Sequence, residues 1–273
     1  MTSANLKFLL IGDIVARPGR RAVETVLPRL REEQEIDLVI ANAENLAGGR
    51  GVTRDTLMEM MNAGVDLFTS GDHVFHNDDW AEILADDSLG ILRPLNYYPD
   101  DLPGRGFVEL KIKDRPVVVG NLAGSERMPT PAANPFVAAD HFLSEHGGSD
   151  KIVLIDFHAE LTSEKRALGF YLDGRAEREG RVNVIWGTHT HVPTADLQIL
   201  PKGTFYVSDL GMVGTKDSVL GVKPEIIIRR FTHPARERFE WEYQGEKVFN
   251  SVLVELGRDG NIVSHQRIDR VIP

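Results

Sequence analysis

The segment Phe8-Leu9-Leu10-Ile11-Gly12-Asp13 is an uninterrupted apolar run that ends in a glycine and a carboxylate. Short apolar runs without polar alternation predict strands buried on both faces of a parallel sheet. Four later segments repeat this arrangement, with acidic, amide or imidazole side chains after a strand-like run: Ala43-Glu44-Asn45, Ser70-Gly71-Asp72-His73, Asp156-Phe157-His158 and Gly187-Thr188-His189-Thr190-His191. Ligands of open α/β sheets bind beyond the carboxyl ends of the strands. The five segments therefore predict one polar site at that edge of an α/β fold.

The sequence between these segments supplies the helices that a parallel sheet requires. Buried strands are predicted at residues 8–11, 38–41, 65–69, 151–156 and 182–186. Helical spacing of apolar residues occurs at 20–34, 53–62, 79–86, 135–146 and 163–171. Pro28 lies inside the first helical stretch, where we expect it to kink or divide the helix.

Antiparallel strands are predicted in the rest of the chain. Two pairs are expected, 107–113 with 117–121 and 196–199 with 204–207. In the last fifty residues, apolar and polar residues alternate at 239–243, 248–256 and 261–267, which predicts strands at a sheet edge or in a second sheet layer. Because no linker and no repeat interrupts the sequence, we expect a single domain over residues 1–273, with a small insertion around 121–150 as an option.

The composition excludes several classes of function. The chain has 273 residues and a net charge of −10, so a partner that offers the groove of duplex nucleic acid is not expected. It contains no cysteine, which leaves only oxygen and nitrogen ligands for a metal and rules out a thiol nucleophile. The N-terminal segment lacks the features of a signal peptide, and no apolar span reaches membrane length. We therefore expect a cytoplasmic protein without a membrane partner.

The polar strand ends favour a two-metal hydrolytic centre, because a buried charge is costly without a partner or a metal. Asp13 could instead cap the turn that follows it. Glu44 can bridge two cations, as carboxylates do in two-metal sites. Asn45 can offer its amide oxygen to a metal or its amide nitrogen to a substrate oxygen.

Histidines supply the other half of the predicted centre. Asp72 can bind a metal while His73, beside it, donates a proton to a leaving oxygen; the alternative is an ordinary Asp–His pair in a surface turn. His189 and His191 would lie on one side of an extended chain, so both rings could reach a metal pair. His158 is a further ligand candidate. Asp156, with Glu160 as a second candidate, is expected to hydrogen-bond a ligand imidazole from outside the ligand shell.

The remaining histidines lie in polar loops or at helix ends and are expected to be solvated: His76, His141, His146, His233 and His265. The same is expected of Arg17 and Arg50. Arg17 and Arg50 follow Asp13 and Asn45 in sequence, so contact with a phosphate is an alternative for either arginine. The glycine-rich run at residues 47–51 predicts only a flexible loop.

The order of the motifs resembles the calcineurin-like metallophosphoesterase superfamily, and most closely its YmdB-like bacterial 2′,3′-cyclic nucleotide phosphodiesterases. The resemblance runs nearly from end to end and rests on four motifs: Gly12-Asp13-Ile14-Val15, Ala43-Glu44-Asn45-Leu46-Ala47-Gly48-Gly49, Asp156-Phe157-His158-Ala159-Glu160 with Thr162-Ser163-Glu164-Lys165, and Gly187-Thr188-His189-Thr190-His191-Val192-Pro193-Thr194-Ala195-Asp196. It implies a four-layer α/β/β/α sandwich that hydrolyses phosphodiesters, with 2′,3′-cyclic nucleotides as the favoured substrates. It further implies two divalent or mixed-valence metal ions per subunit, iron before manganese or zinc, and a homo-oligomer.

Carried over by motif, the resemblance also implies roles for single residues. The metal ligands would be Asp13, Glu44, Asp72, His158, His189 and His191, with Asn45 as a ligand or substrate contact and His73 as general acid. Two positions depart from the wider superfamily. Val15 stands where a histidine is usual, as it does in this branch, and Asp72 stands where the motif has asparagine. We expect the third carboxylate to tighten metal binding and to weaken the attraction for a phosphate anion.

The predicted reaction is attack on phosphorus by a hydroxide held between two cations, with His73 protonating the departing oxygen. Two alternatives fit the same residues. One is a di-metal hydrolase that cleaves another bond, such as an amide or ester. The other is a non-catalytic regulatory protein that binds metal and nucleotide, which the Asp72 departure favours.

Overall fold

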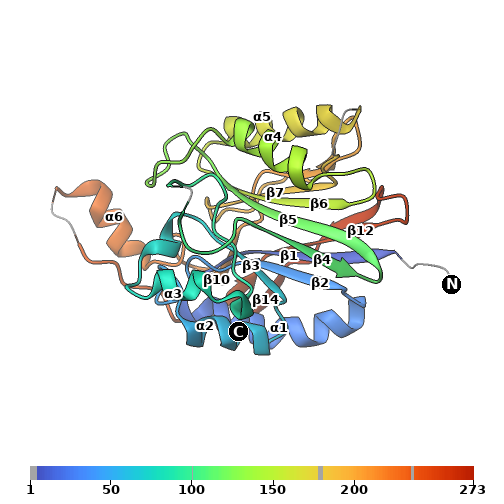
Figure 1. Ribbon diagram of the computed structural model, residues 1–273. Helices are drawn as coiled ribbons and strands as arrows, with labels where there is room; N and C mark the ends of the chain where they lie inside the picture. Colours follow the sequence, from blue (N-terminus) through green and yellow to red (C-terminus); the bar gives the residue numbers. More distant parts are fainter. Residues whose placement is uncertain (1–4, 100, 178–180, 235–236) are drawn as a thin grey trace.

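The computed structural model describes residues 5–99, 101–177, 181–234 and 237–273. Two sheets stack face to face, and helices cover the outer face of each (Figure 1). In the figure, α1 and α2 lie below the lower sheet, and α4 and α5 lie above the upper sheet. The predicted four-layer α/β/β/α sandwich is confirmed.

The first sheet is built around the N-terminal strand and has eight strands in the described residues. They are β1 (Leu6–Ile14), β2 (Leu38–Asn42), β3 (Leu67–Thr69), β10 (Met212–Thr215), β11 (Lys247–Phe249), β12 (Ser251–Leu256), β13 (Ile262–Arg267) and β14 (Arg270–Ile272). β1 pairs in parallel with β2 and β10 and antiparallel with β12. The carboxyl ends of β1, β2 and β3 therefore point the same way.

The second sheet has six strands in the order β4-β5-β6-β7-β9-β8. Their bounds are β4 (Phe107–Ile112), β5 (Arg115–Ala123), β6 (Ile152–His158), β7 (Val184–Thr188), β8 (Gln198–Ile199) and β9 (Phe205–Val207). β5, β6, β7 and β9 are parallel, and the outer strands β4 and β8 are antiparallel to their neighbours. Both predicted antiparallel pairs are thus the edges of this sheet.

The helices follow the predicted positions closely in the first two thirds of the chain. They are α1 (Ala16–Gln34), α2 (Arg54–Asn62), α3 (Trp80–Ala85), α4 (Pro135–His146), α5 (Thr162–Asp173) and α6 (Pro224–Thr232), with 3₁₀ turns at Asp72–Phe75, Asp87–Leu89 and Gly174–Glu177. Thr53 caps α2, because its hydroxyl accepts a hydrogen bond from the Thr56 backbone N–H. None of the helices in the described ranges combines the length and apolarity that crossing a bilayer requires.

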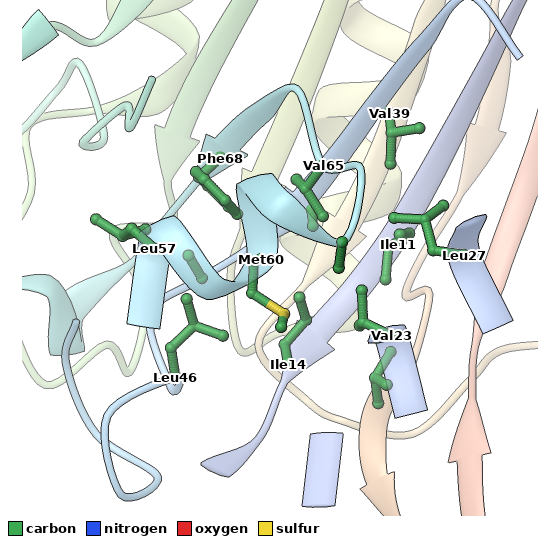
Figure 2. Close-up of a cluster of buried hydrophobic side chains, with 14 of the residues drawn as sticks. Ile11, Ile14, Val23, Leu27, Val39, Leu46, Leu57, Met60, Val65 and Phe68 are labelled. Carbon is green, nitrogen blue, oxygen red and sulfur yellow. The ribbon is translucent and has the colours of Figure 1, made fainter. Parts of the chain in front are cut away.

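Alternation along the strands divides most of the buried apolar side chains of the described residues among three cores. Leu6, Phe8 and Leu10 of β1 pack between the two sheets, whereas Leu9 and Ile11 face the helices of the first sheet. Figure 2 shows this helix-facing core, in which Leu57 and Met60 of α2 and Val23 and Leu27 of α1 gather with Ile11. A third core joins the second sheet to α4 and α5. Close packing on both faces fixes the strand ends that carry the polar residues.

The C-terminal third differs most from the predicted pattern. Residues 239–243 do not form the predicted strand, since only Trp241 makes an isolated bridge, to Val222. The predicted strand 248–256 is two strands, β11 and β12, separated at Asn250. β10, β14 and α6 were not predicted.

In the N-terminal part of the chain, the prediction for Pro28 is wrong in one respect: this residue does not divide α1, which continues through it.

Candidate metal centre

The predicted ligands come from both sheets, and each sheet supplies one kind of side chain. Asp13 near the end of β1, Glu44 after β2 and Asp72 after β3 are the carboxylates of the first sheet. His158 at the end of β6, with His189 and His191 after β7, are the imidazoles of the second sheet. The sandwich brings the acidic edge of one sheet against the imidazole edge of the other.

Four of these residues form a compact set. Ligand atoms of Glu44, Asp72, His158 and His189 all lie within 4.8 Å of one another. The Nε2 atom of His158 lies 3.3 Å from Glu44 Oε2 and 3.6 Å from Asp72 Oδ1. The Nδ1 atom of His189 lies 3.7 Å from Asp72 Oδ1. This arrangement of donor atoms is suited to a single cation.

A second set adjoins the first. The Nε2 atom of His191 lies 3.7 Å from Asp13 Oδ1 and 3.2 Å from the amide nitrogen of Asn45. The same amide nitrogen lies 3.2 Å from Glu44 Oε1, so Glu44 belongs to both sets. We call these seven candidate residues the metal-ligand cluster: Asp13, Glu44, Asn45, Asp72, His158, His189 and His191. The sequence predicted that all seven would converge, and they do so.

The chemistry of the metal-ligand cluster fits divalent cations. Asp13, Glu44 and His158 are buried, and among the described residues Asp13 Oδ1 and Asp72 Oδ1 have no hydrogen-bond partner. A buried carboxylate oxygen without a partner is strongly unfavourable, and a cation would remove that cost. Mixed carboxylate and imidazole donors suit iron, manganese and zinc.

Burial and neighbouring charges have opposing effects on the pKa values of the cluster residues. Burial raises the pKa of Asp13 to about 7 and lowers the pKa of His189 to about 4. Burial also acts against the charged forms of Glu44 and His158, but their mutual attraction outweighs it, so the pKa of Glu44 falls and that of His158 rises. The two side chains lie 3.3 Å apart, within ion-pair distance. A metal that binds His158 must displace its proton.

Hydrogen bonds outside the ligand set fix which nitrogen of each ring faces the cluster. The Nδ1 atom of His158 lies 2.9 Å from the Thr188 hydroxyl, which donates to Asp156 at 2.8 Å. The expected contact of Asp156 with a ligand imidazole is therefore indirect, through Thr188. His189 is oriented the other way, with Nδ1 toward the cluster and Nε2 3.2 Å from Glu160 Oε2. Such partners set ring orientation and tautomer.

A glycine lets the two sheets approach at this point. A Cβ atom on Gly71 would collide with the His158 ring and with the Glu44 carboxylate. Gly71 directly precedes Asp72, so the backbone of this loop passes against the ligands of the opposite sheet. Any side chain at position 71 would separate His158 from Glu44.

The His189-Thr190-His191 segment is a bend, and the prediction that it is extended is wrong. His189 and His191 have φ values of 99° and 64°, in the left-handed region that favours glycine. Two hydrogen bonds hold the bend: Asp13 Oδ2 accepts from the His189 N–H at 3.1 Å, and Asp209 Oδ2 accepts from the Thr190 N–H at 3.1 Å. Both rings reach the cluster because of this backbone conformation, not because of alternation along a strand.

A buried ion pair supports the bend, and the sequence interpretation missed half of it. Lys165 Nζ donates to Asp209 Oδ2 and to the Thr188 carbonyl, both at 2.7 Å, and both charged side chains are buried. The sequence interpretation includes Lys165 only as part of a motif. Asp209 follows β9 as the other polar residues follow their strands, and this was the available signal.

A cavity of about 520 Å³ opens onto the metal-ligand cluster. Glu44, Asn45, His73, His189 and His191 line its inner part. His73 is partly exposed there, and its Nδ1 lies 2.7 Å from the Asn45 amide oxygen. Arg50 lines the same cavity, whereas Arg17 is not among the described residues that line it.

Two stacked sheets with acids and imidazoles converging at their strand ends define a metallophosphoesterase of the calcineurin-like class. The family model described as "YmdB-like protein" matches residues 9–268, and the chain belongs to this family. It is 37% identical to the 2′,3′-cyclic-nucleotide 2′-phosphodiesterase of Bacillus subtilis, over 98% of this chain and 97% of that one.

Solved structures show the same relationship. A phosphatase from Mycoplasma pneumoniae has a TM-score of 0.90 and 33% identity, covering 99% of this chain and 95% of its own. A hypothetical protein from Thermus thermophilus has a TM-score of 0.89 and 38% identity, covering 98% of this chain and 100% of its own. The resemblance inferred from the sequence motifs is confirmed.

Proposed function

We propose that this protein hydrolyses phosphodiesters, with 2′,3′-cyclic nucleotides as its principal substrates. The observation that carries the proposal is the convergence of Glu44, Asp72, His158 and His189, whose ligand atoms lie within 4.8 Å of one another. The name of the Bacillus subtilis relative supports the substrate class. The cavity beside the cluster is open to a small phosphoester.

In this proposal the metal-ligand cluster holds two divalent or mixed-valence ions, iron before manganese or zinc. Glu44 contacts residues of both ligand sets and would be among the residues that hold the ions. When bound, such ions activate water and offset the charge of a phosphate. The role of the protein is to hold three carboxylates and three imidazoles in place at the ends of buried strands. The Asn45 amide nitrogen, which faces Glu44 and His191, is a hydrogen-bond donor beside them.

His73 is the proposed general acid. Its Nδ1 faces the Asn45 oxygen, so Asn45 orients the ring within the cavity wall. In hydrolysis of a cyclic phosphate, water forms a new bond to phosphorus and the bond from phosphorus to one ribose oxygen breaks. His73 gives its proton to that ribose oxygen, which leaves as a hydroxyl group.

Elemental analysis of freshly purified protein, followed by assays on a panel of substrates, tests the proposal. The panel contains 2′,3′-cyclic nucleotides, linear phosphodiesters, a carboxylic ester and an amide. We expect two metal ions per chain and turnover of the cyclic nucleotides that a chelator abolishes. A metal-replete protein that cleaves only the ester or amide, or that binds nucleotides without cleaving any substrate, would contradict the proposal.

A further inference from the structure

The outer part of the cavity differs in character from the metal-ligand cluster. It is lined by apolar and aromatic side chains and two arginines, which come from the loop after β2 and from residues 219–231 and 239–241. Figure 1 shows α6 standing out from the sandwich, at the end toward which β1 and β2 run. We call five residues of this lining the aromatic wall: Arg50, Arg230, Phe231, Phe239 and Trp241.

One aromatic ring of this wall is fixed in place. Trp241 packs against Val15, Ala16 and Met212 and still lines the cavity. Its indole lies directly on Gly49, where a Cβ atom would overlap the ring, and Gly49 has a φ of 86° that favours glycine. Gly49 of the glycine-rich loop therefore leaves the space in which the Trp241 ring packs beside the cavity.

A second ring is exposed to solvent. Phe231 lies at the end of α6, lines the cavity and is 84% exposed. Among the described residues, no other aromatic ring stacks on Phe231 or on Trp241. Exposing a phenylalanine to water is unfavourable, and a flat apolar ligand would cover it.

The two arginines of the wall have no acidic partner in the part of the chain that the structure describes. Their guanidinium groups lie over the Phe239 ring, with that of Arg50 5.8 Å and that of Arg230 5.0 Å from its centroid. No carboxylate in the described ranges lies within ion-pair distance of either. In a chain with a net charge of −10, two such cations at one cavity mouth favour an anionic ligand.

Aromatic rings beside arginines of this kind are the combination that binds a nucleobase and a phosphate of a single-stranded nucleotide. We propose that the aromatic wall binds the nucleoside end of a substrate that carries a phosphate on its 5′ oxygen. The base lies against Trp241 and Phe231, and the 5′ phosphate lies at Arg50 and Arg230. This inference rests on the proposed function, because the metal-ligand cluster would hold the 2′,3′-cyclic phosphate. The substrate then resembles the 3′-terminal nucleotide of a cleaved RNA strand.

Binding to the purified, metal-containing protein tests the wall without requiring turnover. Calorimetry compares adenosine 5′-monophosphate with ribose 5-phosphate, which lacks the base, and with adenosine, which lacks the phosphate. We expect the complete nucleotide to bind at least about tenfold more tightly than either fragment. Equal binding of nucleotide and ribose 5-phosphate would overturn the proposal.

Exposed residues of α6 provide matched variants. Phe231→Ala should lower the preference for nucleotide over ribose 5-phosphate by about tenfold, and Arg230→Met should lower the preference for nucleotide over adenosine. Ile228→Ala and Arg229→Met, which alter residues outside the cavity lining, should leave both ratios at the wild-type value. Identical ratios in all four variants would overturn the proposal.

Turnover separates this inference from the proposed function. The two substrates are adenosine 2′,3′-cyclic phosphate with a 5′ phosphate and methyl riboside 2′,3′-cyclic phosphate. We expect the kcat/KM ratio of the first to the second to fall in Phe231→Ala. If wild-type protein hydrolyses neither substrate, the proposed function fails whatever the binding data show. If it hydrolyses both and Phe231→Ala leaves their ratio unchanged, the wall proposal alone fails.

Discussion

The metal-ligand cluster and the aromatic wall share one cavity, yet the chain builds them in opposite ways. The cluster consists of mostly buried side chains at the ends of strands that are packed on both faces. The wall consists of side chains on a loop and around one protruding helix, and Phe231 and Arg230 are exposed. In our proposal the buried sheet edge carries the chemistry, and the more exposed surface around it selects the substrate.

Glu44→Gln should produce the largest effect, because it removes the one carboxylate that contacts both ligand sets. We expect loss of bound metal and a fall in turnover of at least about 10⁴-fold, since the ions account for several kcal/mol of transition-state stabilisation. Metal analysis and kcat measure the two losses. Glu82→Gln, at an exposed position on α3 outside the cavity lining, should retain its metal; equal metal loss in both variants would remove the distinction.

His73→Ala should retain metal and still lose about 10²- to 10⁴-fold in kcat, the usual contribution of a general acid. The matched variant is His76→Ala, three residues further on, which should keep both metal and turnover. Elemental analysis decides the assignment of His73, because an empty His73→Ala protein would make it a metal ligand instead. His191→Ala should lose metal occupancy.

Lys165→Met tests whether the cluster depends on support from outside it. The substitution leaves Asp209 buried and unpaired beside the His189 bend, which should lower the free energy of unfolding by about 3–5 kcal/mol. Chemical denaturation measures the change. Adding Asp209→Leu should recover part of it, because the unpaired charge is then gone.

The control is Lys151→Met, which breaks a more exposed ion pair with Glu109 and should cost less than about 1 kcal/mol. Similar losses for Lys165→Met and Lys151→Met would show that the buried pair has no special role. No such pair supports the aromatic wall in the described residues.

Asp72→Asn should have the smallest effect on the cluster, since it keeps the shape of the side chain and removes one of three carboxylates. We expect roughly tenfold weaker metal retention together with a lower KM for a phosphodiester. Metal dialysis and steady-state kinetics measure both. If neither quantity moves, the charge at position 72 does not explain the departure from asparagine.

The sequence was sufficient to predict the cluster because each ligand follows a local pattern, a buried strand and then a polar side chain. Asp13, Glu44 and Asp72 could be placed together without knowing any long-range contact, since parallel strands of one sheet share their carboxyl edge. The stacking of His158 and the other imidazoles, which belong to the second sheet, against these acids was implied only by the resemblance. The backbone of His189 and His191 could not be predicted, because its left-handed conformation depends on hydrogen bonds that backbone N–H groups of this segment donate to Asp13 and Asp209.

The wall could not be predicted for the same physical reason. The alternation at residues 239–243 resembles a strand, but these side chains are placed by distant partners. Trp241 rests on Gly49, and Phe239 contacts both Arg50 and Arg230. No local periodicity records such contacts.

The division of acids to one sheet and imidazoles to the other has a consequence for cohesion of the sandwich. Any cation bound by both kinds of ligand is a cross-link between its two halves. A ligand that binds only the folded state stabilises it. Tighter binding of that cation would therefore raise the free energy needed to separate the two sheets. Depletion of the ion in the cell would then lower the free energy of unfolding as well as the activity.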